Sequence, residues 1–273
     1  MKTILVPVDF SETSLNAARY AVKFARQVGC KVTLLHAFTP SPVMPLKDGL
    51  PLTEDDLWEI NMTELNKVAL TLAPIDLLVK IDYLQLRGRL FEVVSQFEES
   101  IQTMAVVMGI TGAGKVKEAI IGSNTIAVSS RTVIPVLIVP EDAVYQPVTD
   151  VGLTTDFKNV VEAIPEDKIK ELINLLGAKL HVLNVDFKSR DWNNDTPFQS
   201  GLIETMFEHY HPEYHFIENS NIAEGLSDYA EKHSIELLIA IPKQHNLVDH
   251  LFSKSQTKEL AFHSRVPVMI MHA

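Results

Sequence analysis

Residues 106–123 read VVMGITGAGKVKEAIIGS. The apolar residues up to Met108 are typical of a buried strand that ends at Gly109, and Ser123 is a favourable residue for starting a helix. Four glycines lie in this stretch: Gly109, Gly112, Gly114 and Gly122. Glycine permits positive φ and lets a phosphate approach backbone amides, while a helix N-terminus adds unpaired N–H groups. Because such loops lie at the carboxyl edge of an open parallel sheet, the stretch predicts an α/β fold with a ligand site there.

Short β-branched runs alternate with amphipathic stretches on both sides of this loop, an order that favours βαβ units. Ser11 and Thr53 are suitable helix caps, and Gly29 is a suitable helix end. We expect strands at 4–8, 32–35, 79–86, 104–108 and 136–139, and helices after 11, after 53, near 90–99 and beyond 123. Five strands and four helices make one complete doubly wound domain.

The same order of features recurs in the second half of the chain. Asp9-Phe10 is echoed by Asp156-Phe157, each after a short apolar run. Residues 123–125 and 135–136 are echoed at a shared offset of 132, as 255–257 and 267–268. Agreement in order and spacing argues against chance resemblance between strand sequences.

We therefore predict two related α/β domains in tandem, residues 1–143 and 149–273, joined by an acidic, proline-containing link. Each is expected to be a doubly wound, five-stranded parallel sheet with helices on both faces.

The composition excludes several classes of protein. With 273 residues, 46% hydrophobic and 22% charged, the chain is neither collagen-like, disordered nor a disulfide scaffold. A net charge of −11 without a basic run argues against nucleic acid or an anionic membrane as a partner. No apolar stretch approaches the roughly 18 residues of a membrane span, and the single cysteine, Cys30, favours a reducing compartment. We expect a cytoplasmic protein.

The glycine spacing also comes close to a P-loop, but Val116 stands where the magnesium-binding Ser or Thr should follow Lys115. A P-loop commonly follows the first strand of its domain, whereas this loop follows the fourth. The pattern Gly109-x2-Gly112-x9-Gly122-Ser123, together with Val6-Pro7-Val8-Asp9-Phe10-Ser11, instead resembles the ATP-binding branch of the universal stress protein family.

This resemblance covers the whole chain as two family domains and implies a Rossmann-like fold of the adenine nucleotide alpha hydrolase type. It implies ATP, or ADP or AMP, as the ligand, with or without Mg. It also implies that the final strands, 136–139 and 268–271, pair across the domains so that one chain mimics the family's homodimer. A further homodimer stays open.

Carried over by position, the resemblance assigns three groups of residues to the nucleotide. Asp9 and the backbone of Pro7 and Val8 would meet adenosine, and the Ala37 backbone would meet adenine. Met108, Gly109 and Gly112 would line the ribose and phosphates. The phosphate oxygens would be bound by Gly122, Ser123, Asn124 and Thr125. Asp9 as a loop cap for the first helix is the structural alternative.

The second half departs from this pattern. At the shared offset, Gly109 becomes Ile241, and Gln244 and Lys254 stand in place of the next two family glycines. These side chains should fill the space that phosphate needs, so we expect one nucleotide per chain, held by the first domain.

The histidines leave one question open. His209-x-His211-x3-His215 could bind zinc or act as a proton switch, or could be a solvated loop, and we assign no metal to it. His36 is expected to be a packed core histidine.

Three functions fit the sequence: a nucleotide-binding stress-response or signalling module, a slow ATPase or nucleotidyl-transfer enzyme, and a dimerisation scaffold. No catalytic residue is assigned, because only Lys115 offers charge to a transferred phosphate. The first function is preferred.

Overall fold

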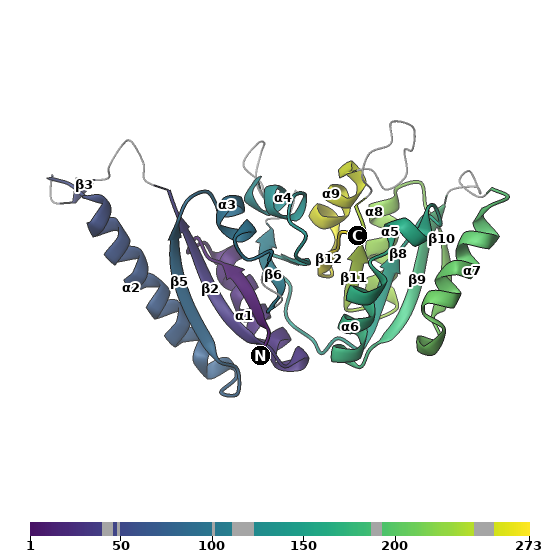
Figure 1. The fold of residues 1–273 in the computed structure, drawn as a ribbon, viewed down its shortest axis with the longest axis horizontal. Helices are drawn as coiled ribbons and strands as arrows, with labels where there is room; N and C mark the ends of the chain where they lie inside the picture. Colours follow the sequence, from purple (N-terminus) through teal and green to yellow (C-terminus); the bar gives the residue numbers. More distant parts are fainter. Residues whose placement is uncertain (40–45, 48–49, 100–101, 111–122, 187–192, 243–253) are drawn as a thin grey trace.

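The computed structural model describes residues 1–273 except 40–45, 48–49, 100–101, 111–122, 187–192 and 243–253. One ten-stranded sheet runs through the whole molecule (Figure 1). Its strands, from one edge to the other, are β10 (Glu213–Glu218), β9 (Lys179–Asp186), β8 (Asp150–Thr154), β11 (Leu237–Ala240), β12 (Val268–Ile270), β7 (Val136–Pro140), β6 (Thr103–Ile110), β1 (Thr3–Pro7), β2 (Lys31–Phe38) and β5 (Ile81–Arg87).

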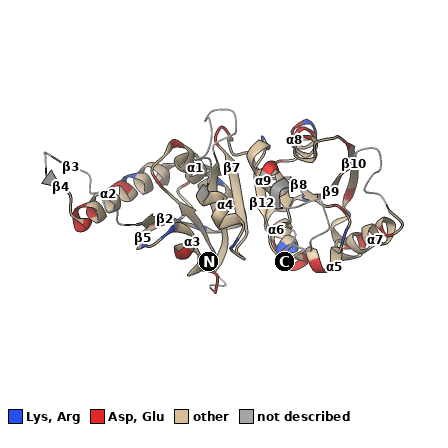
Figure 2. Cartoon of the chain, turned by 90° about the horizontal axis from the view of Figure 1, so that it is seen from above, with Lys and Arg blue, Asp and Glu red and all other residues tan. Residues whose placement is uncertain are grey.

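Helices cover both faces of the sheet in each half (Figure 2). They are α1 (Glu12–Val28), α2 (Glu54–Leu72), α3 (Leu90–Ser95), α4 (Ser123–Ser129), α5 (Val160–Ala163), α6 (Glu166–Leu176), α7 (Thr196–Met206), α8 (Ile222–Lys232) and α9 (Lys254–His263). Short 3₁₀ turns follow α2 at Ala73–Ile75 and α7 at Glu208–Tyr210. Among the residues that the structure covers, no helix is long and apolar enough to cross a membrane.

The predicted pairing of the two final strands is present. Within each half, all pairings of the ten-stranded sheet are parallel. At the junction, β12 pairs antiparallel with β7, with Met269 opposite Leu137. Two five-stranded parallel sheets therefore join into one, and the doubly wound α/β fold is confirmed.

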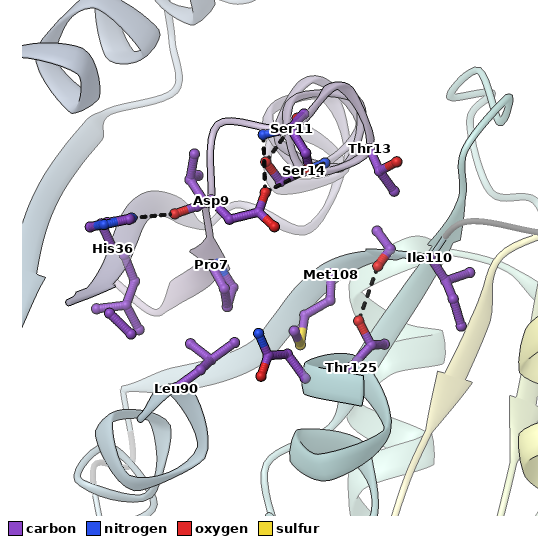
Figure 3. A pocket seen from close by; sticks show the side chains of 15 residues that line it. Pro7, Asp9, Ser11, Thr13, Ser14, His36, Leu90, Met108, Ile110 and Thr125 are labelled. Carbon is purple, nitrogen blue, oxygen red and sulfur yellow. Dashed lines mark hydrogen bonds between the residues drawn. The ribbon is translucent and has the colours of Figure 1, made fainter. Parts of the chain in front are cut away.

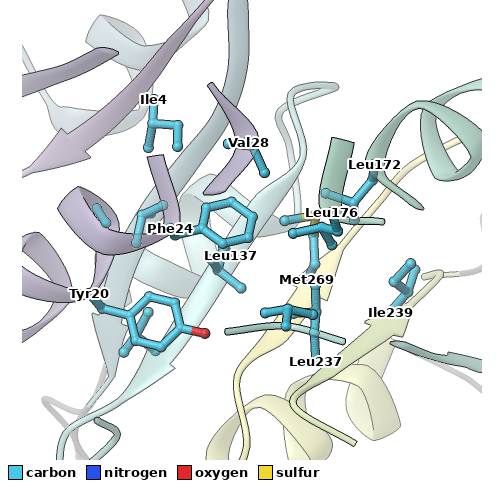
Figure 4. Packing of buried hydrophobic residues seen from close by; sticks show 14 of the residues in the cluster. Ile4, Tyr20, Phe24, Val28, Leu137, Leu172, Leu176, Leu237, Ile239 and Met269 are labelled. Carbon is cyan, nitrogen blue, oxygen red and sulfur yellow. The ribbon is translucent and has the colours of Figure 1, made fainter. Parts of the chain in front are cut away.

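The hydrophobic core also crosses the junction. Phe24 on α1 and Leu137 on β7 belong to the same buried cluster as Leu172 on α6 and Met269 on β12 (Figure 4). Each of these four side chains is no more than 2% exposed. Because the cluster draws on both halves, apolar burial stabilises their association as well as each sheet.

A single glutamine adds polar contacts across the junction. The Gln27 amide nitrogen on α1 donates to the carbonyls of Val148 (2.8 Å) and Leu176 (3.2 Å). Its oxygen accepts from the Val148 amide at 2.9 Å and from the Tyr145 hydroxyl. Gln27 thus ties the first helix to the segment that connects β7 with β8.

The predicted helix boundaries rest on caps that the structure contains. The Ser11 side chain accepts from the Ser14 amide at the start of α1. Thr53 and Asp56 form a capping box at the start of α2. Gly29 and its repeat Gly177 both end a helix in the left-handed region, at φ 68° and 65°.

The sequence prediction missed or shortened some elements. A small hairpin, β3 (Leu46–Lys47) and β4 (Leu50–Pro51), lies where only a proline-rich loop was expected. The helix expected near 90–99 ends at Ser95. Strands β2 and β6 run further than predicted, to Phe38 and Ile110.

Candidate functional site

A cavity of about 370 Å³ lies at the carboxyl ends of β1, β2 and β6 (Figure 3). The starts of α1, α3 and α4 close its sides. Its lining consists of Pro7, Val8, Asp9, Ser11, Thr13, Ser14, Leu35, His36, Ala37, Leu90, Met108, Gly109, Ile110, Asn124 and Thr125. This is the edge at which ligands bind in open parallel sheets.

A strained turn places Asp9 at the rim. Phe10 adopts φ 64°, a left-handed conformation that a bulky side chain rarely takes. The turn brings the Ser11 amide and hydroxyl to Asp9 Oδ1, at 3.0 and 2.6 Å. Partial burial raises the pKa of Asp9, but hydrogen bonds from Ser11 and Ser14 outweigh it and hold the pKa below the ordinary 3.8. Asp9 is therefore a carboxylate at neutral pH.

Gly109, at the end of β6, has a structural role that the sequence did not predict. A Cβ at Gly109 would lie 2.4 Å from the Thr13 carbonyl oxygen and 2.9 Å from its carbonyl carbon. Gly109 is thus required because the first turn of α1 packs directly on β6, not because its φ is positive. The Gly109 carbonyl accepts a hydrogen bond from the Thr125 hydroxyl at 3.0 Å, which joins β6 to α4 (Figure 3).

His36 corrects the prediction of a packed core histidine. Its ring is partly exposed and lines the cavity. Nδ1 lies 2.7 Å from the Val8 carbonyl oxygen, and the ring packs on Phe10 with 4.9 Å between centroids. Among the apolar residues Leu34, Leu35 and Ala37, His36 was expected in the core, but β2 ends at the cavity, so its ring lies between Phe10 and the cavity.

Eight of the predicted site residues line this one cavity: Pro7, Val8, Asp9, Ala37, Met108, Gly109, Asn124 and Thr125. Gly112 and Gly122 lie outside the described residues, and Ser123 is the first residue of α4. The sequence assigned no ligand role to Ser11, Thr13 or Ser14. Their position directly after Asp9, at the start of a helix, was the available signal.

At the corresponding place in the second half, the residues that the structure describes leave little space. Phe157 repeats the left-handed turn of Phe10, at φ 54°, and Asp156 precedes it. Ile241 occupies the position of Gly109 and is only 8% exposed. The cavity that it lines with Asp156 and Val160 measures about 20 Å³.

The histidine group proposed from the sequence does not assemble. His209 and His211 are exposed, in and just after the 3₁₀ turn before β10. His215 instead lies on β10 with Nε2 3.0 Å from Nδ1 of His181 on β9. No spacing pattern linked His181 to His215, because the sheet brings them together from 34 residues apart.

Comparisons with known proteins agree with the fold. A solved universal stress protein from Archaeoglobus fulgidus matches 99% of this chain and 98% of its own, with a TM-score of 0.71 at 19% identity. A universal stress protein of Methanocaldococcus jannaschii is 29% identical over 140 residues, 50% of this chain and 81% of its own. One from Thermus aquaticus is 30% identical over 138 residues, 50% of this chain and 98% of its own. The sequence profile of the universal stress protein family matches residues 1–140, and the chain belongs to that family.

Proposed function

We propose that the first domain, residues 1–143, binds one adenine nucleotide, ATP, ADP or AMP, and that the protein acts as a nucleotide-sensing module in stress response or signalling. The observation that carries the proposal is the assembly of the cavity. Residues chosen for nucleotide contact from separate parts of the sequence meet around one space at the carboxyl edge of the sheet.

The size and chemistry of this space suit a nucleotide. Its volume of about 370 Å³ falls within the usual range of small-molecule sites. Ala37, Leu90 and Met108 supply apolar surface for a base. Ser11, Thr13, Ser14, Asn124 and Thr125 supply polar surface for ribose and phosphate. The hydroxyls of Ser11, Ser14 and Thr125 already donate within the protein and can only accept further hydrogen bonds, so the Asn124 side-chain amide is the group that would donate to a phosphate oxygen.

Asp9 is the residue whose charge matters most for recognition. An ionised carboxylate only accepts hydrogen bonds, so it suits the hydroxyls of ribose or the amino group of adenine. It would repel a nearby phosphate. We therefore expect adenosine at the β1 end of the cavity, next to Asp9. The phosphates would lie on the α4 side, next to Asn124 and Thr125.

The described lining contains no lysine or arginine, so these residues would hold phosphate oxygens through neutral donors. Asp9 is also the one carboxylate among them. Magnesium would therefore enter with the phosphates, whose charge it would partly neutralise, rather than occupy a cage of protein ligands. This arrangement favours retention of the nucleotide over rapid transfer of a phosphoryl group.

One nucleotide per chain follows from the contrast between the halves. Ile241 places a buried side chain where Gly109 leaves room for α1 to approach and for the cavity to open. A space of about 20 Å³ beside Asp156 cannot admit a nucleoside.

Calorimetric titration of ATP into the nucleotide-free protein tests the proposal, with Asp9→Asn and the matched Asp156→Asn. We expect one site per chain and at least about tenfold weaker binding for Asp9→Asn, since a charged hydrogen-bond partner is lost. Asp156→Asn should bind as the parent does. Mass spectrometry of the recovered nucleotide then distinguishes retention from slow hydrolysis.

Two results would refute the proposal. One is a parent protein that binds no adenine nucleotide, which would favour the scaffold function. The other is equal weakening by Asp9→Asn and Asp156→Asn.

A further inference from the structure

A group of histidines and carboxylates lies at the amino ends of the strands in the second half. His181 is on β9, Glu213 and His215 are on β10, and Asp150 begins β8. The His181 Nδ1 lies 3.0 Å from His215 Nε2 and 3.8 Å from Glu213 Oε2. His215 Nε2 lies 4.0 Å from the same Glu213 oxygen. None of these residues lines the nucleotide cavity.

The spacing of these three donor atoms fits a transition metal. Separations of 3.0, 3.8 and 4.0 Å form a triangle whose centre lies about 2.1 Å from every corner. Zinc–nitrogen and zinc–oxygen bonds are roughly 2.0–2.2 Å long. An ion slightly above the plane would therefore need only small shifts of the side chains, and two imidazoles with a carboxylate are a ligand set that zinc accepts.

Asp150 fixes the orientation of the first ligand. Its Oδ1 lies 2.8 Å from His181 Nε2. Because an ionised carboxylate only accepts, Nε2 of the neutral ring carries the proton and Nδ1 presents its lone pair to Glu213 and His215. Asp150 is itself anchored, since its amide donates to Glu236 at 2.9 Å and its Oδ2 accepts from the Thr149 hydroxyl at 2.8 Å. Carboxylate–histidine pairs of this kind accompany metal-binding histidines.

The second ligand is held by aromatic packing, and the group is open to solvent on one side. The His215 ring packs on Tyr229 of α8, with 5.3 Å between centroids, and Tyr229 stacks on His233. The side chains of His181 and His215 are 11% and 24% exposed, but that of Glu213 is 62% exposed. Three ligands with one open side leave a fourth position for water.

The fold does not require this group of side chains. In the second half, Asp150 lies opposite Lys179, and His181 lies opposite Glu213. At the same places in the first half, Thr3 lies opposite Lys31, and Thr33 lies opposite Asp82. Thr3, Thr33, Asp82 and Leu84 are therefore the register counterparts of Asp150, His181, Glu213 and His215. The first half has a contact of 2.9 Å between two threonine hydroxyls where the second has an Asp–His pair.

We propose that His181, Glu213 and His215 bind one zinc ion, with Asp150 as a positioning residue and water at the fourth position. The proposal is independent of the nucleotide site, which lies in the other half of the chain. Among the residues that the structure describes, this is the group whose ligand atoms come close enough together for a metal.

The test is calorimetric titration of zinc chloride into chelator-stripped full-length protein. We expect one zinc ion per chain. His181→Thr and His215→Leu install the side chains of the first half, so they should fold, and each should weaken zinc binding at least a hundredfold. Asp150→Asn should weaken it about 10- to 100-fold through the orientation of His181. Thermal unfolding in chelator checks that each variant is folded.

His209→Ala and His211→Ala are the matched controls, because both histidines are exposed, precede Glu213 closely in the sequence and do not belong to the group of ligand atoms. They should bind zinc as the parent does. Failure of the parent to bind zinc would overturn the proposal, as would equal loss in the controls. If a ligand variant does not fold, parent crystals soaked in zinc decide: an anomalous peak between the three donors is expected, and its absence contradicts the site.

Discussion

At the scale of the residue, two phenylalanines hold the chain in a conformation that costs free energy. Phe10 and Phe157 both follow an aspartate at the end of a strand and both have positive φ. Their rings pack on His36 of β2, the strand beside β1, and on Phe216 of β10, which lies two strands from β8. Ring burial therefore offsets backbone strain, and the turn directs Asp9 and the first turn of α1 toward the cavity.

Replacing Phe10 separates these two contributions. Phe10→Ala and Phe10→Gly both lose the ring, but only alanine keeps the left-handed penalty, so the glycine variant should be more stable by about 1 kcal/mol. Urea unfolding measures the difference. Lys23→Ala and Lys23→Gly, at an exposed position of α1, are the control pair. There the alanine variant should be the more stable one, because glycine is the poorer helix former by about 1 kcal/mol. If the alanine variant is the more stable one at both positions, the backbone at Phe10 is not strained.

The pKa of Asp9 predicts a pH dependence. Its folded pKa lies below 3.8, so the carboxylate stabilises the folded state fully above that value and loses this effect as the pH falls through the lower folded pKa. The parent should therefore exceed Asp9→Asn in stability at neutral pH, and the gap should close in acid. Thermal unfolding between about pH 2 and 7 measures the gap. A gap that widens in acid would show that the folded pKa is raised.

The sequence predicts the structural role of a residue best when that residue contacts its near neighbours in the chain. Asp9, Ser11 and Gly29 act through neighbours two to four positions away, which spacing reveals. Gly109 and His36 depend on contacts with distant segments, Thr13 and the Val8 carbonyl. The sequence singled out Gly109 for backbone freedom and phosphate approach, but it did not predict the contact with Thr13.

At the scale of the element, the two final strands make the junction. The apolar residues of β7 and β12 are buried because each strand has neighbours on both sides. Their sequences alone are equally consistent with ordinary burial in separate domains, so the family resemblance supplied the pairing. The hairpin β3–β4 has a local sequence signal, since Asp48-Gly49 between two short apolar runs is a strong hairpin sequence.

Truncation of Leu137 tests the junction. The side chain is fully buried in the cluster that both halves share, so Leu137→Ala should lower the free energy of unfolding by about 2–5 kcal/mol. Leu78→Ala is the control, because Leu78 is 73% exposed and should change stability by about 0.5 kcal/mol or less. Denaturant unfolding compares them. Equal effects would mean that Leu137 does not pack as described.

At the scale of the whole molecule, one sheet and one core cluster make the two halves depend on each other. The sequence predicted their tandem relation from repeats in order and spacing. It also predicted that their sites differ, because Ile241, Gln244 and Lys254 replace three family glycines and should fill the space that phosphate needs. It could not predict the His181–His215 pair, whose proximity depends on strand register.

Gln27 provides a test of the coupling between halves. Gln27→Ala removes the acceptor of the Val148 amide and the donor to Val148 and Leu176, and should lower stability by about 1–3 kcal/mol. The exposed Gln96→Ala should have almost no effect. Calorimetric unfolding should show one transition that moves as a whole. Destabilisation of only one of two separate transitions would contradict coupling.

Photolabelling with 8-azido-ATP tests the central claim most directly, because it reports where the nucleotide lies. Irradiation of the complex, digestion and mass spectrometry should find label in peptides from the first half, around residues 7–15, 35–38 or 108–110, at no more than one per chain. Excess ATP should suppress it. Label that ATP suppresses equally in the second half, around Asp156 or Ile241, would contradict a single nucleotide site in the first domain.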